Sequence, residues 1–196
     1  MEFRTERLLL RSAREDDLEP LHAILSDPRA MAYWSSLPHG NLQATREWLS
    51  SMIAIRPGEG EDFIIERDGQ LLGKAGLYRF PEIGYILHPD HWGRGYAREA
   101  LTLVIDRAFD VHGLDRISAD VDPRNEGSLG LLRRLHFQET HRAERTWQIG
   151  GEWYDSIYLA LEPADWRRSR AEKKGRQFPA GPSNHISFEP TIRGCP

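Results

Sequence analysis

The chain has very little cysteine, and this scarcity limits the classes of protein to which it can belong. Its 196 residues include a single cysteine, Cys195, close to the C-terminus. One thiol cannot form an internal disulfide framework, so we expect the protein to act in a reducing compartment. Eight histidines are present, but they are scattered without the spacing of metal ligands, and no metal site is predicted.

Long hydrophobic runs and an excess of positive charge are also missing. No apolar stretch is long enough to cross a membrane, and Met1 is followed by charged residues instead of a signal sequence. Lysine and arginine together number 26 against 30 aspartates and glutamates, which gives a formal net charge of −4. Proteins that bind nucleic acid over a broad surface are usually basic. We therefore expect a cytoplasmic protein that binds neither a membrane nor nucleic acid.

What the chain does contain is enough apolar material for one domain of ordinary size, because 39% of its residues are hydrophobic. We assign this domain to residues 1–162 and a basic, proline-containing C-terminal extension to residues 163–196, which we expect to be a short helix followed by a mobile or surface-wrapping tail. Helical periodicity predicts helices near 18–25, 44–53, 97–111 and 127–135. Alternation and turn signals predict strands at 3–11, 63–66, 71–78, 82–87, 116–121, 137–149 and 153–161.

The most informative segment is a glycine-containing loop between strand 82–87 and the helix that follows it, Trp92-Gly93-Arg94-Gly95-Tyr96-Ala97. Glycine lets the backbone approach an anion closely, and the first N–H groups of a helix have no internal partner and can bind that anion. The segment therefore predicts a site for a phosphate-bearing cofactor. It lacks the lysine of a P-loop, and Arg98 stands where a dinucleotide-binding loop has its third glycine. A surface turn that merely caps a helix is the alternative.

This loop resembles the pyrophosphate loop of the GCN5-related N-acetyltransferases (GNATs), Gln/Arg-x-x-Gly-x-Gly/Ala, except that Trp92 takes the first position. The resemblance extends over about residues 3–161 to the subgroup that includes ribosomal-protein-alanine acetyltransferases. The segments that carry it are Thr5-Glu6-Arg7-Leu8-Leu9-Leu10-Arg11, Asp27-Pro28-Arg29-Ala30-Met31, Glu82-Ile83-Gly84-Tyr85, Asn125-Glu126-Gly127-Ser128 and Gly151-Glu152-Trp153-Tyr154-Asp155. The family usually has Gly-Phe after the helix that follows Ser128, and this chain has His136-Phe137.

The resemblance implies an α/β (α+β) fold with a single GNAT-like domain. Its central mixed, mostly antiparallel sheet would have six to seven strands, flanked by about four helices and splayed between the fourth and fifth strands. The cofactor would be acetyl-CoA, released as coenzyme A after direct transfer of its acetyl group to a primary amine in a ternary complex. The acceptor is either a protein N-terminus or a small-molecule amine. Family members are often homodimers, but no interface can be read from this sequence.

The same resemblance assigns the cofactor-binding residues. The pyrophosphate would be held by the loop residues Trp92, Gly93, Arg94, Gly95, Tyr96, Ala97 and Arg98. The pantetheine arm would lie along the strand at Tyr85 to His88 like an added strand, with an N–H near Ile86 or Leu87 polarising the thioester carbonyl. Asn125 would hydrogen-bond the same arm, or else serve only as a helix cap.

Three residues are candidates for acid–base chemistry. Glu82 is the candidate general base for the acceptor amine, and a surface glutamate at a strand start is the alternative. Ser128 is the candidate acid that protonates the leaving thiolate, with Tyr85 as a weaker candidate, and an ordinary first-turn helix residue is the alternative for Ser128. Six further side chains are candidates to line the acceptor side: Trp34, His39, Trp48, Trp147, Trp153 and Tyr154.

Two other functions compete with catalysis. A GNAT fold can serve as a sensor that binds acetyl-CoA without transferring its acetyl group. The basic cluster at 167–176 offers a nucleic-acid or ribosome-docking segment, although Asp165 and Glu172 dilute its charge, and a solvated helix face is the preferred interpretation.

Overall fold

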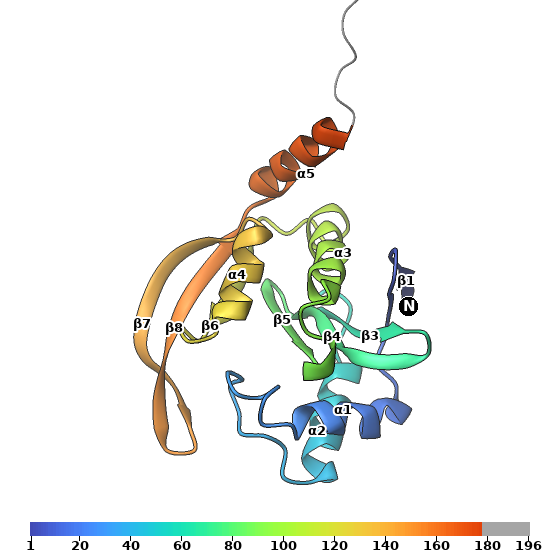
Figure 1. Ribbon diagram of the computed structural model, residues 1–196, viewed down its shortest axis with the longest axis vertical. Coiled ribbons are helices and arrows are strands. Elements are labelled where there is room, and N and C mark those ends of the chain that lie inside the picture. Colours follow the sequence, from blue (N-terminus) through green and yellow to red (C-terminus); the bar gives the residue numbers. More distant parts are fainter. Residues whose placement is uncertain (178–196) are drawn as a thin grey trace, which may run out of the picture.

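The computed structural model describes residues 1–177, with side chains described as far as Glu172. The tail predicted beyond Gln177, including Cys195, lies outside the described residues. Within them the chain forms one open sheet with helices on both faces (Figure 1). No helix in this part of the chain is long and apolar enough to cross a membrane.

The sheet has eight strands in the order β1-β2-β3-β4-β5-β6-β8-β7. Only the β5–β6 pair is parallel, and all other neighbours are antiparallel. The strands are β1 (Glu2–Arg4), β2 (Leu9–Arg11), β3 (Glu61–Arg67), β4 (Gln70–Arg79), β5 (Glu82–Leu87), β6 (Ile117–Val121), β7 (Gln138–Ile149) and β8 (Glu152–Leu161). This confirms the predicted mixed, mostly antiparallel sheet.

The strand count differs from the prediction at the N-terminus. The segment predicted as one strand over 3–11 is two short antiparallel strands, β1 and β2, joined by a turn in which the Thr5 backbone N–H donates to the Leu8 carbonyl at 2.9 Å. The run Leu8-Leu9-Leu10 does not alternate and gives no signal of the turn; Phe3 and Leu10, seven positions apart, share a face only because the chain reverses between them. Counting β1 and β2 as one strand restores the seven predicted.

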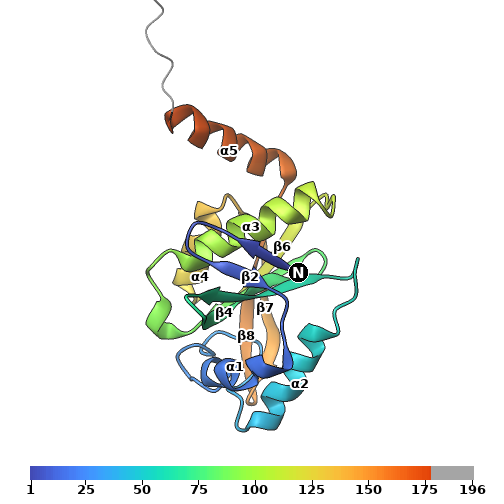
Figure 2. The ribbon, with the colours of Figure 1, turned by 90° about the vertical axis from the view of Figure 1, so that its right-hand side faces the viewer.

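Helices cover both faces of the sheet (Figure 2). They are α1 (Leu18–Leu25) and α2 (Leu42–Ile53) on one face, and α3 (Tyr96–Asp110) and α4 (Glu126–Arg134) on the other; short 3-10 turns, η1 (Glu15–Asp17) and η2 (Pro89–His91), precede α1 and α3. Strand β3 shows how both faces are filled: Phe63 and Ile65 pack in the core under α3, whereas Ile64 packs with Leu21 and Leu49 on the opposite face. A strand buried on both sides is apolar without alternation.

The sheet opens between β5 and β6. These two strands pair only at Glu82 and Ser118, and β6 then continues along β8 (Figure 1). The resemblance implied a splay between the fourth and fifth strands. When β1 and β2 are counted as one strand, β5 and β6 are the fourth and fifth. The outer backbone edge of β5 beyond Gly84 is therefore not covered by β6.

The turn after α4 explains one departure from the family pattern. His136 has a φ of 71°, a left-handed conformation that glycine adopts without steric cost. The Phe137 N–H donates to the Leu132 carbonyl at 3.0 Å and closes the helix end. The family's glycine fits this geometry, and His136 keeps it at some cost in backbone strain.

Helix α5 (Pro163–Gln177) begins at the predicted boundary of the C-terminal extension. Its first turn docks on the domain, because Trp166 is buried in the core under α3 and its indole N–H donates to Asp106 at 2.7 Å. The division of the chain at residues 162 and 163 stays a prediction.

Candidate active site

The predicted phosphate loop has the geometry of an anion-binding turn. Gly93 and Gly95 both have positive φ, 71° and 80°, and Gly95 is the N-cap of α3. The first helical hydrogen bond runs from the Glu99 N–H to the Gly95 carbonyl at 3.1 Å. The N–H groups of residues 96–98 therefore precede the helical ladder and are available to an anion at the positive end of the helix dipole.

Two side chains of this loop, those of Trp92 and Tyr96, stabilise its conformation. The Trp92 indole N–H donates to the Leu87 carbonyl at 2.9 Å, which ties the loop to the end of β5 although the ring is half exposed. The Tyr96 side chain is buried in the core, so only its backbone can reach a cofactor. Trp92 can thus replace the family's Gln or Arg if backbone groups bind the phosphate.

Strand register decides which backbone groups of β5 face the gap. The His88 N–H donates to the Leu72 carbonyl at 2.9 Å, and antiparallel partners alternate between bonded and non-bonded pairs. Ile86, opposite Lys74, therefore directs its N–H and C=O toward β4. Leu87 and Tyr85 direct theirs away from β4, toward the gap. Of the two N–H groups predicted to polarise a thioester, that of Leu87 has the appropriate direction.

Tyr85 and Ser128 meet on the α4 side of β5. Their hydroxyl oxygens lie 2.7 Å apart, and burial raises the pKa of Tyr85 to about 12 although the Ser128 hydroxyl lowers it. Asn125 caps α4, because its side-chain oxygen accepts the Ser128 N–H at 3.0 Å. Asn125 therefore caps α4 and fixes the position of Ser128, while its contact with the pantetheine arm stays a prediction.

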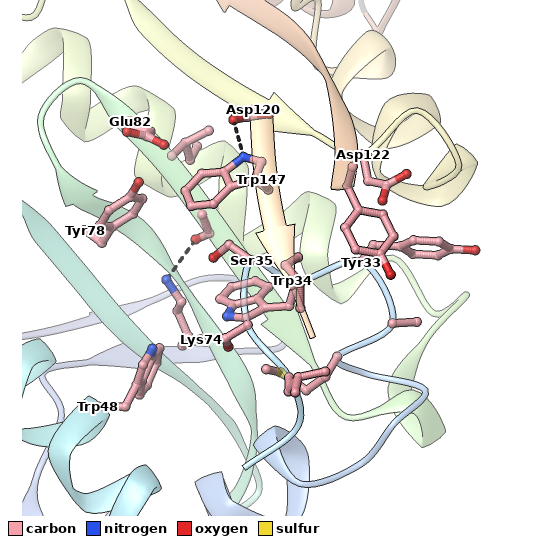
Figure 3. A pocket seen from close by; sticks show the side chains of 18 of the residues that line it. Tyr33, Trp34, Ser35, Trp48, Lys74, Tyr78, Glu82, Asp120, Asp122 and Trp147 are labelled. Carbon is pink, nitrogen blue, oxygen red and sulfur yellow. Dashed lines mark hydrogen bonds between the residues drawn. The ribbon is translucent and has the colours of Figure 1, made fainter. Parts of the chain in front are cut away.

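A cavity of about 890 Å³ lies on the other side of β5. Figure 3 shows many of the side chains that line it, which come from the loop before α2, from α2 itself, from β3 to β6 and from the β7–β8 hairpin. Four of the six predicted acceptor-side residues are among them: Trp34, Trp48, Trp147 and Tyr154. The other two are elsewhere, since His39 bonds the Thr45 hydroxyl at 2.9 Å and Trp153 is stacked under Arg145.

Glu82 lines this cavity at the point where β5 and β6 meet. It is paired with Arg79 at 2.8 Å, and its side chain is 23% exposed. Burial raises the pKa of the adjacent Tyr78 hydroxyl, and hydrogen bonding to Glu82 raises it further. Opposite them in Figure 3, Trp147 donates its indole N–H to Asp120 at 2.9 Å. Alternation along β5 thus places Glu82 on the cavity side and Tyr85 on the α4 side.

A buried ion pair forms one wall of the cavity, and sequence reasoning missed it. The Lys74 ammonium lies 3.0 Å from Asp62, and both side chains are 2% exposed. Burial raises the pKa of Asp62, while the charge of Lys74 and its hydrogen bond lower it. The ammonium also lies 5.7, 5.8 and 5.7 Å from the ring centroids of Trp34, Trp48 and Tyr78.

The cavity carries more negative than positive side chains. Its three cations, Lys74, Arg79 and Arg124, pair with Asp62, Glu82 and Asp122. The remaining carboxylates of its lining, Glu59, Asp120 and Asp155, pair with none of these cations. Arg124 also lies between the rings of Tyr33 and Tyr154, at 5.6 and 4.6 Å from their centroids, and so connects the loop before α2 to β8.

Comparison with known proteins places the chain in a family. The acetyltransferase (GNAT) domain model matches residues 7–138. An uncharacterized N-acetyltransferase p20 from Bacillus licheniformis is 34% identical over 145 residues, which cover 69% of this chain and 81% of that protein.

Solved structures share the fold. The ribosomal-protein-S5-alanine acetyltransferase from Vibrio fischeri superposes with a TM-score of 0.71 at 24% identity, covering 85% of this chain and 98% of that one. The spermidine N-acetyltransferase from Vibrio cholerae, solved with CoA and spermine, gives a TM-score of 0.72 at 22% identity, covering 83% of this chain and 99% of that one. The family match and the relative at 34% identity decide the assignment: this chain belongs to the GCN5-related N-acetyltransferases and is an acyltransferase.

Proposed function

We propose that this protein transfers the acetyl group of acetyl-CoA to a primary amine by direct attack in a ternary complex. The observation that carries the proposal is the arrangement around β5. The strand leads into the phosphate-type loop at its C-terminal end, presents Glu82 to a cavity on one face, and holds Tyr85 against Ser128 on the other.

The residues present fit acetyl-CoA. A side chain added at Gly93 would meet no atom within 4 Å, so the front of the loop is open to a bulky anion. The N–H groups of residues 96–98 and the helix dipole favour a pyrophosphate there. The Leu87 N–H and the Tyr85 N–H and C=O, which face the gap, offer an extended ligand with amide groups the partners of an added strand.

The division of Glu82 and Tyr85 between two faces of β5 suits a base and an acid with separate tasks. Acetyl-CoA supplies the acetyl group as a thioester. Glu82 would remove the proton from an amine that enters through the cavity, directly or through a water molecule. The Leu87 N–H would stabilise negative charge on the carbonyl oxygen. Ser128, with Tyr85 hydrogen-bonded behind it, would donate a proton to the leaving thiolate.

The acceptor that fits the cavity best is a small cationic amine. Asp120 and Asp155 form no ion pair with the cations of the lining and leave it with negative charge, which raises the local concentration of cations. Aromatic faces such as those of Trp34 and Trp147 add favourable contacts for an ammonium or an alkyl chain. A relative of the same fold was solved with spermine, which supports this choice. A protein N-terminus is the second candidate, supported by the likeness to a ribosomal-protein-alanine acetyltransferase.

Cofactor binding is tested first, by calorimetric titration of the native protein with acetyl-CoA. The Gly95→Glu variant should lose binding, because it places a carboxylate and a strained side chain in the loop. Gly113→Glu is the control for backbone strain, since Gly113 also has a positive φ, 62°, but lies in open space beyond the other end of α3, whereas a Cβ at Gly95 would lie 3.4 Å from Arg7 Nη2. Equal binding by Gly95→Glu and the native protein would contradict the assignment of the loop.

The reaction is tested by a panel of amines analysed by mass spectrometry. The panel contains monoamines, diamines, polyamines and peptides with free N-termini. Acetylated product from cationic small amines supports the proposal. Product from peptides alone would instead identify protein N-termini as the acceptor. Tight acetyl-CoA binding without product from any acceptor would favour the sensor function instead.

A further inference from the structure

Arg7 lies behind the phosphate-type loop, on the turn between β1 and β2. Its Nη1 atom donates to the Arg94 carbonyl at 3.0 Å, and its Nε atom donates to Glu99 at 2.7 Å. The guanidinium also lies 4.9 Å from the centroid of the Tyr96 ring. One side chain near the N-terminus thus contacts three residues of the loop and of the first turn of α3.

The bond to the Arg94 carbonyl fixes a peptide plane. In a trans peptide the C=O and the N–H point in opposite directions. The Arg94 carbonyl is held toward Arg7, so the Gly95 N–H is directed to the opposite side of the loop. The neighbouring Gly93 is not crowded either, since a side chain added there would meet no atom within 4 Å.

The bond from Arg7 to Glu99 neutralises a carboxylate at the start of α3. Glu99 lies in the first turn of α3, where its carboxylate would repel a pyrophosphate bound at the same helix end. It accepts from the Thr5 hydroxyl at 2.5 Å and from the Arg7 backbone N–H at 2.7 Å, in addition to the guanidinium. Burial raises the pKa of Glu99, but these hydrogen bonds outweigh burial and lower it. Glu99 is therefore ionised, and Arg7 supplies the compensating positive charge.

We infer that Arg7 is a positioning residue for the pyrophosphate of the acetyl donor. It orients the Gly95 N–H toward the phosphate and neutralises the Glu99 carboxylate beside it. Arg7 contacts Arg94, Glu99 and Tyr96, and it acts through them. The inference depends on the proposed function, since it assumes that this loop binds acetyl-CoA.

The test compares CoA binding by calorimetry in the native protein, Arg7→Met, Arg7→Lys and Arg14→Met. Arg14→Met is the matched control, because Arg14 forms a surface ion pair with Glu2 at 2.9 Å near the same N-terminal hairpin. Loss of charge-assisted hydrogen bonds should weaken CoA binding by Arg7→Met about tenfold or more. Arg7→Lys keeps the charge and should recover part of the affinity, and Arg14→Met should bind as the native protein does. Unfolding temperatures show that each variant is folded at the temperature of titration.

A second readout separates positioning from general damage. With an acceptor identified in the amine panel, kcat/KM is measured for acetyl-CoA and for S-acetyl-pantetheine, which lacks the pyrophosphate. Arg7→Met should lower kcat/KM for acetyl-CoA and leave that for S-acetyl-pantetheine unchanged. Equal loss with both donors, or native CoA affinity in Arg7→Met, would overturn the inference. Absence of CoA binding in the native protein would instead refute the proposed function.

Discussion

The hydroxyl oxygens of Tyr85 and Ser128 lie 2.7 Å apart, one on β5 and one on the first turn of α4. The contact bridges two elements that line the splayed part of the sheet. Because Asn125 fixes the Ser128 backbone and burial keeps Tyr85 protonated, the two hydroxyls form a short proton-donating chain. This pair is the strongest candidate for the acid that the leaving thiolate requires.

Removal of either hydroxyl should slow turnover. We expect Ser128→Ala to lower kcat about 100-fold, the usual range for loss of a general acid, with acetyl-CoA affinity unchanged in calorimetry. Tyr85→Phe should have a smaller effect, and the double variant should be no slower than Ser128→Ala if the two act as a unit. Ser156→Ala is the control, because Thr146 and Ser156 form an equally short hydroxyl pair elsewhere, on β7 and β8. Native kcat in Ser128→Ala would remove this residue from the mechanism.

The raised pKa of Tyr85 predicts an alkaline loss of stability. Burial raises its pKa from 10.0 to about 12, so the folded state binds the proton more tightly than the unfolded state does. The stabilisation is complete below pH 10 and is lost as pH rises through about 12. By pH 11 it should fall by about 1 kcal/mol, measured by urea unfolding between pH 8 and pH 11. Tyr85→Phe should show a shallower decline, and an identical decline would contradict the assignment.

Glu82→Gln should separate chemistry from cofactor binding. The change removes the base but keeps the side-chain volume and a hydrogen bond with Arg79. We expect kcat to fall about 100-fold, while the dissociation constant for acetyl-CoA stays as in the native protein. Glu59→Gln is the control, because it removes one carboxylate from the same cavity lining and should retain turnover. Equal rates for Glu82→Gln and the native protein would exclude Glu82 as the base.

Trp147 should affect binding of the acceptor amine and not binding of acetyl-CoA. Its indole N–H bonds Asp120 at 2.9 Å and holds the β7–β8 hairpin against the cavity. Trp147→Phe removes this hydrogen bond and should raise KM for the acceptor several-fold, with calorimetric affinity for acetyl-CoA unchanged. Trp153→Phe is the control, because Trp153 lies on the neighbouring strand with 45% exposure against 42% for Trp147 but does not line the cavity. A change confined to kcat would argue against an acceptor-binding role.

Local signals in the sequence predicted the turn between β3 and β4, the position of the glycine loop before α3, and all strands except the break between β1 and β2. Asp68-Gly69 connects β3 to β4 with positive φ at both residues, 51° and 79°, which this residue pair favours in two-residue hairpins. Gly93 and Gly95 likewise both have a positive φ, which glycine adopts without steric cost. In each case the residue type itself selects the local geometry, so no distant contact is needed.

Long-range contacts could not be predicted in the same way. Arg7 and Glu99 are 92 positions apart, and Tyr85 and Ser128 are 43 apart. Nothing in either local pattern indicates its partner. Lys74 shows the difficulty most clearly: a lysine in the strand 71–78 suggests a solvent-facing position, yet it is buried because Asp62 on β3 neutralises it. Which side chains meet across a sheet depends on the register of its strands. That register is fixed only when the whole sheet assembles, so a local sequence pattern does not reveal it.

The Lys74–Asp62 pair should stabilise the fold only while both partners are present. Lys74→Met leaves a buried carboxylate without its cation, and we expect the free energy of unfolding to fall by about 3–5 kcal/mol. The double change Lys74→Met with Asp62→Leu removes both charges, and it should recover most of that loss because aromatic rings already surround the site. Urea unfolding at pH 7 measures both. Equal destabilisation by the single and double changes would show that the pair acts through packing alone.

The pH dependence of Lys74→Met gives a further check on the same pair. Burial already raises the pKa of Asp62, and Lys74 opposes that rise, so removal of Lys74 should raise the pKa more. The folded variant then binds a proton that the unfolded chain releases, because an exposed aspartate titrates near pH 3.9. Stability of Lys74→Met should therefore increase as pH is lowered from 7 toward 5, while the double variant, which lacks Asp62, should show no such gain. A flat profile for Lys74→Met over this range would mean that solvent reaches the Asp62 carboxylate once Lys74 is gone.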